Sequence, residues 1–115
     1  MNKQDIEKSL SILKGSEASY PFGSEALVFK VMGKIFALIS QNELIPRITL
    51  KCPPADAEIL VGQFKSVTPG YYMNKKHWIT ISLTDELPEE MLVDLMNGSY
   101  RSVVDKLTKR DKKML

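Results

Sequence analysis

Residues 26–40, ALVFKVMGKIFALIS, decide the fold, because they contain two apolar runs separated by a short turn around Gly33. Side chains alternate between two faces before this glycine, and the run after it is almost wholly apolar. The pattern predicts two antiparallel strands, with Gly33 taking the positive φ angle that a tight hairpin turn requires. We therefore expect an antiparallel sheet built around this hairpin.

The segment before the hairpin predicts an N-terminal helix followed by a loop. Asn2 can cap a helix in which Ile6 and Leu10 share one apolar stripe, and Gly15 suits its left-handed end. Residues 16–23, SEASYPFG, carry polar and structure-breaking side chains. We expect them to form a loop.

The segment after the hairpin alternates between extended and helical patterns. Further strands are expected at residues 47–52 and 77–83, and further helices from Pro54 and over residues 87–107. The pair Asn97-Gly98 can break the last helix into two pieces. The order helix, strands, helix, strand, helix predicts an α+β fold, in which N-terminal and C-terminal helices cover one face of a single antiparallel sheet.

Length and composition indicate one globular domain over residues 1–115, ending in a basic tail, residues 108–115, that we expect to fray. The single cysteine excludes an intramolecular disulfide. No signal peptide and no run of membrane-spanning length is visible, so we expect a soluble cytoplasmic protein without membrane contact. A monomer or a weak dimer is expected, because one edge of the sheet can pair with a second copy.

Charged and aromatic residues are distributed unevenly along the chain. Residues 68–83, TPGYYMNKKHWITISL, hold the only histidine, the only tryptophan, two of the four tyrosines and a lysine pair. Residues 59–84 contain no aspartate or glutamate, whereas residues 85–94 contain only acidic charges. The carboxylate-free window favours the approach of a phosphate, because no local repulsion opposes it.

Four stretches together resemble the YjbR/MmcQ family: residues 21–39, 48–52, 69–83 and 87–107. The resemblance covers nearly the whole chain, roughly residues 20–107, and its most specific element is the run GYYMNKKHW. It implies a bacterial protein with a fold like that of the frataxin homologue CyaY. It also implies DNA binding, since members of the family are described as predicted DNA-binding proteins.

The sequence and the resemblance together predict a non-catalytic protein that binds DNA through a basic loop braced by aromatic residues. Lysines neutralise phosphates, and aromatic rings stack on bases or brace the loop. The net charge of +2 is small, so the binding is expected to be weak, salt-sensitive and poorly sequence-specific. The predicted contacts are Lys75 and Lys76 to phosphate, Asn74 and His77 as polar contacts, and Tyr71, Tyr72 and Trp78 as braces or stacking platforms. The tail offers secondary phosphate contacts at Lys109, Arg110, Lys112 and Lys113.

Two other functions stay open at this point. The same Tyr/His/Trp loop could form a concavity for a small ligand or a surface for a protein partner. Third in rank is an enzyme that uses His77, the only imidazole, with Cys52 as the only candidate thiol nucleophile. We expect no metal site and no cofactor, because one histidine and one cysteine cannot supply the usual ligands.

Overall fold

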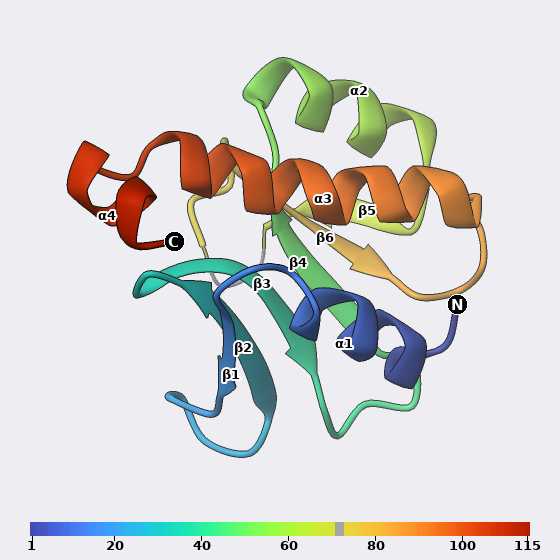
Figure 1. The fold of residues 1–115 in the computed structure, drawn as a ribbon. Coiled ribbons are helices and arrows are strands. Elements are labelled where there is room, and N and C mark those ends of the chain that lie inside the picture. Colours follow the sequence, from blue (N-terminus) through green and yellow to red (C-terminus); the bar gives the residue numbers. More distant parts are fainter. Residues whose placement is uncertain (71–72) are drawn as a thin grey trace.

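The structure, a computed structural model, describes residues 1–70 and 73–115, within which four helices flank one six-stranded sheet (Figure 1). The helices are α1 (Lys3–Ser11), α2 (Pro54–Gln63), α3 (Glu89–Asp105) and α4 (Lys109–Met114). The strands are β1 (Ser16–Ser19), β2 (Ala26–Val31), β3 (Lys34–Ser40), β4 (Arg47–Lys51), β5 (Val67–Pro69) and β6 (Trp78–Ser82). Each strand runs antiparallel to its neighbours in the order β1-β2-β3-β4-β6-β5. The predicted α+β class, with helices flanking a single antiparallel sheet, is confirmed.

The central hairpin forms where the sequence predicts it. Strands β2 and β3 pair from Ala26↔Ser40 to Val31↔Lys34, and the turn between them has φ values of +50° at Met32 and +77° at Gly33. A two-residue turn with two positive φ angles matches the right-handed twist of the strands that it joins. Glycine adopts such an angle without steric cost, whereas Met32 adopts it at some cost in strain.

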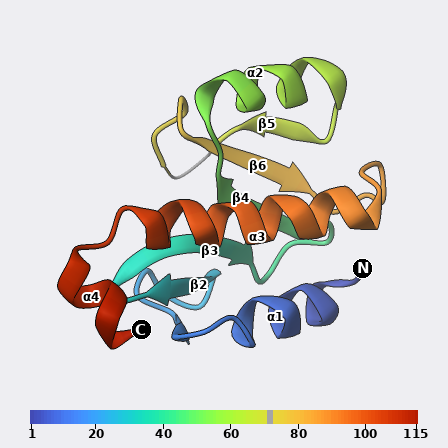
Figure 2. The ribbon, with the colours of Figure 1, turned by 45° about the horizontal axis from the view of Figure 1, so that its top comes forward.

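The helices bury one face of the sheet. In Figure 2, α3 crosses the sheet, and it contacts β2, β3 and β4, whereas α1 contacts β1 and α2 contacts β5 and β6. Ile39, Ile48 and Ile81 are partners in register on three neighbouring strands and form a row in the hydrophobic core. Leu10 of α1 and Met96 of α3 belong to the same core. Full burial of each such side chain contributes roughly 1.5–3 kcal/mol.

The loop predicted at residues 16–23 is wrong in its first half, where the chain forms the edge strand β1. Ser16 to Ser19 pair with Val31 to Val28 through the backbone, while most of their side chains stay exposed. An edge strand held by backbone hydrogen bonds leaves no alternation of apolar residues to detect. The short strand β5 was missed for a related reason, because only Val67 of its three residues is buried.

The predicted break at Asn97-Gly98 is also wrong, because α3 continues without interruption to Asp105. Ser99 follows the pair and is fully buried. Its Oγ donates a hydrogen bond to the carbonyl oxygen of Phe36 at 2.6 Å and accepts one from the backbone N–H of Lys51 at 2.9 Å. A glycine inside a helix costs only about 1 kcal/mol, so this tertiary anchoring outweighs it.

The basic tail, which was expected to fray, forms the helix α4. The hydroxyl of Thr108 caps it by accepting a hydrogen bond from the backbone N–H of Asp111 at 3.1 Å. Leu115 packs against the core, and its side chain lies against Gly15, which has the left-handed φ of +74° that the sequence predicts. The tail is therefore helical, and its last residue is docked on the domain.

Candidate functional site

The loop before β6 is shaped by Asn74. The side-chain oxygen Oδ1 of Asn74 accepts a hydrogen bond from the backbone N–H of Lys76 at 2.8 Å, and its carbonyl oxygen accepts one from the N–H of His77 at 3.1 Å. Asparagine commonly closes turns in this way, by bonding backbone two residues further on. Asn74 was predicted to contact DNA. In the structure its side-chain oxygen instead binds the backbone of the loop and so fixes the position of the lysine pair.

Both ends of the loop are fixed to the strands. The N–H of Gly70 donates to the carbonyl oxygen of Trp78 at 2.7 Å, and the N–H of Cys52 donates to the carbonyl oxygen of His77 at 2.8 Å. Trp78 is only 8% exposed at the start of β6. A buried ring at this point gives the loop a firm base. Tyr71 and Tyr72, the other predicted aromatic braces, lie outside the described residues.

The lysine and histidine side chains of this loop face solvent. Lys75, Lys76 and His77 are all exposed. Within residues 1–70 and 73–115, no ion pair within 4 Å joins them to a carboxylate; the pair found there joins Arg47 to Glu43. Two adjacent ammonium groups are therefore available to an anion from outside the domain.

A hollow lies on each side of the loop. On the α2 side, Lys75 and Lys76 border a hollow of about 330 Å³, which Glu58 also lines. On the α3 side, Met73 and Trp78 border a second hollow of about 430 Å³. The loop thus separates two concavities, with its lysine pair over the first and its apolar side chains in the second.

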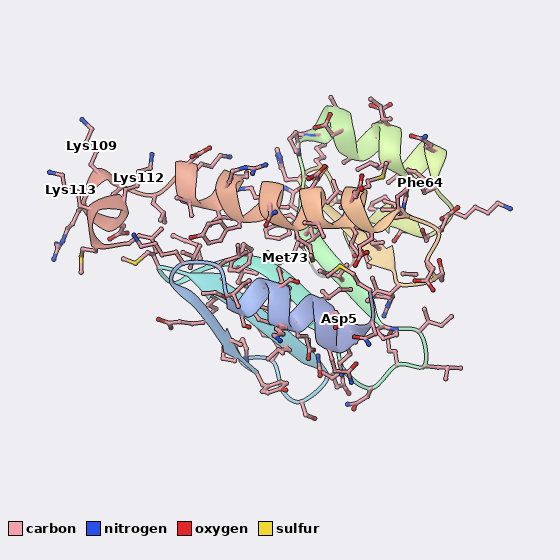
Figure 3. The ribbon with its side chains drawn as sticks, turned by 45° about the vertical axis from the view of Figure 1, so that its right-hand side comes forward. Asp5, Phe64, Met73, Lys109, Lys112 and Lys113 are labelled. Atoms are coloured by element: carbon pink, nitrogen blue, oxygen red, sulfur yellow. The ribbon has the colours of Figure 1, made fainter. Side chains whose placement is uncertain are left out.

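The predicted secondary contacts lie toward the same end of the molecule. Figures 1 and 2 both show α4 and the loop near the C-terminal end of α3. Leu107, which directly precedes the tail, lines the 430 Å³ hollow together with Met73 of the loop. Figure 3 shows the side chains of Lys109, Lys112 and Lys113 extending away from the body of the domain. Arg110 is likewise exposed on α4.

Sequence reasoning missed three lysines that the fold brings to the α3 side of the loop. The 430 Å³ hollow is lined by Lys34 from the start of β3, Lys51 from the end of β4 and Lys106 from the end of α3. The pKa of Lys51 is lowered from its ordinary value, first by burial and then by the charge and hydrogen bond of Lys106. They lie far apart in sequence. No sequence pattern groups them, and the pairing of Lys51 with Trp78 across β4 and β6 becomes visible only in the fold.

The geometry does not support a Cys52–His77 nucleophilic pair. Cys52 is only 4% exposed, and burial, followed by the Asp56 carboxylate, raises the pKa of its thiol to about 11. Such a thiol is protonated at neutral pH and is a poor nucleophile. His77 is exposed, and no hydrogen bond between its ring and the Cys52 thiol is found among the described side chains.

The described part of the chain lacks two further features. No group of three or more His, Cys, Asp or Glu side chains there is arranged to hold a metal ion. None of the helices formed by those residues has both the length and the apolar character needed to cross a membrane.

Comparison with known proteins identifies the relatives of this chain. It is 44% identical to the uncharacterized protein YbdF of Escherichia coli O157:H7, covering 98% of this chain and 96% of that protein. It is 34% identical to the uncharacterized protein YjbR of Escherichia coli K12, covering 88% and 86%. A crystal structure of the Deinococcus radiodurans protein DR2400, a DUF419 domain, superposes with a TM-score of 0.88 at 36% identity, covering 96% and 85%.

A model of a whole protein family identifies the same relationship as these individual relatives. The YjbR family model matches residues 11–102, which include the hairpin, the loop before β6 and most of α3. The predicted likeness to the frataxin homologue stays a prediction. By sequence and by fold, the chain belongs to the YjbR family.

Proposed function

We propose that the protein binds DNA without sequence specificity, through phosphate contacts from Lys75 and Lys76. The observation that carries this proposal is the exposed lysine pair on a loop fixed at both ends. A preorganised cationic loop loses little conformational entropy when it meets a phosphate. His77 follows the pair and adds an exposed polar contact.

The charge of the domain sets the expected strength. A net charge of +2 and two central lysines allow few phosphates to be neutralised. Each neutralised phosphate adds about 0.9 to the slope of log affinity against log salt concentration. Binding is therefore weak and is lost as salt rises. The four cations of α4 lie toward the same end of the molecule and add secondary contacts to a long duplex.

The test is a titration of fluorescently labelled duplex DNA with the whole protein at two salt concentrations. We expect binding at low salt, and we expect Lys75→Glu with Lys76→Glu to weaken it strongly. The matched control is Lys3→Glu with Lys8→Glu on α1, which changes the net charge equally. The loop variant and the α1 variant carry the same number of substitutions, so a general effect of net charge on DNA affinity is the same in both.

Two results would overturn the proposal. One is the absence of any binding by the wild-type protein at low salt. The other is an equal loss of binding in the loop variant and the α1 variant, because a localised contact predicts a difference between them. A shallower salt slope in the loop variant, by about two phosphate contacts, supports the assignment.

A further inference from the structure

The hollow on the α3 side of the loop combines a cationic rim with apolar walls. Its volume of about 430 Å³ lies within the range of small-molecule sites. Ile35, Met73 and Trp78 supply apolar surface from the sheet and the loop, and Val103 and Leu107 supply it from the end of α3 and the residues after it. A ligand that fills it therefore needs an apolar part.

The charged residues that line this hollow are all cations. Lys34, Lys51 and Lys106 line it, and no aspartate or glutamate is found among its described lining residues. Lys106 lies close enough to Lys51 to contribute to the lowered pKa of Lys51, because both side chains are positively charged. An anion between them would remove this repulsion and would gain charge-assisted hydrogen bonds.

Carboxylates line a neighbouring hollow. Asp56, Asp94 and Asp105 border that space, and so do Lys51 and Lys106. No ion pair within 4 Å joins either lysine to a described carboxylate. Neither ammonium group is therefore held in a direct ion pair by a described acid of the domain.

We propose that this hollow binds a small molecule with an apolar body and a carboxylate or phosphate group. Trp78 and its apolar neighbours would cover the body, and Lys51 and Lys106 would bind the anionic group, with Lys34 closing the rim. The proposal does not depend on DNA binding, because Lys75 and Lys76 border the other hollow. Failure of the DNA titration leaves it intact.

Trp78 provides a direct readout, since it is the only tryptophan in the chain and it lines the hollow. The experiment follows its fluorescence and its indole N–H resonance while 3-phenylpropanoate or 2-phenylethyl phosphate is added to the whole protein. These probes share an apolar body and distinguish a carboxylate from a phosphate. Neutral 3-phenylpropanamide tests the need for charge, and inorganic phosphate tests the need for the apolar body.

We expect at least one of the two anionic probes to shift both Trp78 signals, and to bind roughly tenfold more tightly than the amide, as for a charge-assisted hydrogen bond. Inorganic phosphate alone should bind more weakly than the phenyl-bearing anion. Lys51→Met with Lys106→Met should reduce anion affinity by a similar factor and leave the amide unchanged. Lys3→Met with Lys8→Met removes the same charge from α1 and should have no effect.

Three outcomes would refute the proposal. Neither anion moves the Trp78 signals, or the neutral amide binds as tightly as the anions, or the Lys51/Lys106 variant keeps full anion affinity. The indole resonance of the unliganded variant verifies its fold before any titration. If that variant does not fold, Lys34→Ala replaces it, because Lys34 is an exposed residue at the start of β3. A smaller loss of anion affinity is then expected, and unchanged affinity contradicts the proposal.

Discussion

The backbone N–H of Gly70 donates a hydrogen bond to the carbonyl oxygen of Trp78 at 2.7 Å, in a contact too close for any side chain at position 70. A Cβ atom there would lie 2.6 Å from the Cβ of Trp78 and 3.0 Å from its carbonyl oxygen. Both neighbours are part of a strand and cannot move independently. The approach of two backbones thus determines where the loop leaves the sheet.

Gly70→Ala should therefore lower the free energy of unfolding by about 1–3 kcal/mol, as overpacking does in other cores. Urea denaturation measures this change. Gly98→Ala is the matched control, since a Cβ at Gly98 meets no atom within 4 Å. Alanine inside α3 should raise stability by roughly 0.5–1 kcal/mol. Equal effects from the two substitutions would contradict the assigned contact.

Ser99→Ala should destabilise the domain by about 1–3 kcal/mol for each buried group that it leaves unsatisfied. The hydroxyl joins the carbonyl oxygen of Phe36 on β3 to the N–H of Lys51 on β4, and no water reaches the fully buried serine. Ser102→Ala, in the same helix, is expected to change stability by less than about 0.5 kcal/mol. Thermal or urea unfolding of both variants distinguishes a specific anchor from a general effect of serine in α3.

The elements with strong apolar periodicity were predicted from the sequence, and the elements held by backbone contacts were not. The hairpin around Gly33 and the Asn2 cap follow from local rules, and both are observed. The edge strand β1 and the unbroken helix at Gly98 depend on distant partners, so local propensity could not indicate them.

The candidate site, too, was predicted where it depends on neighbouring residues and missed where it depends on distant ones. Lys75, Lys76 and His77 are neighbours in sequence, so their grouping was visible before the fold was known. Lys51 and Lys106 are separated by 54 intervening residues along the printed chain and meet only because α3 ends over β4. A hollow assembled from four separate segments leaves no pattern in a single sequence.

The Cys52 thiol should react slowly with iodoacetamide in the native protein and quickly after unfolding. It is buried, and its pKa is raised to about 11 by burial and by the Asp56 carboxylate. Mass spectrometry of alkylation with and without urea measures the two rates. Rapid native alkylation near neutral pH would contradict the burial described here.

The same raised pKa predicts a pH dependence of stability. The folded protein keeps the proton on Cys52 more strongly than the unfolded chain, whose thiol titrates near 9. This contribution is complete below about pH 9 and is lost as the pH rises through about 11. The stability advantage of wild type over Cys52→Ala should therefore shrink across that interval and stay constant below it. A constant difference at alkaline pH would show that the two states bind the thiol proton equally.

Lys106→Met should raise the free energy of unfolding near neutral pH, by up to about 1 kcal/mol, because it removes a like charge beside Lys51. The lowered pKa of Lys51 means that its charged form opposes folding until the pH rises through that pKa. The gain from Lys106→Met should therefore diminish as the solution becomes alkaline.

Urea denaturation at about pH 7 and about pH 10 measures both effects, since lysine titrates near the upper value. Lys109→Met on α4 is the matched control, and it should change stability little at either pH. Tyrosine and cysteine residues titrate in the same way in all variants, so their contributions cancel when the free energies of unfolding of two variants are subtracted. If Lys106→Met proves no more stable than the control, the two ammonium groups do not repel each other. The hollow would then offer an anion no electrostatic advantage beyond that of an ordinary lysine-bearing surface.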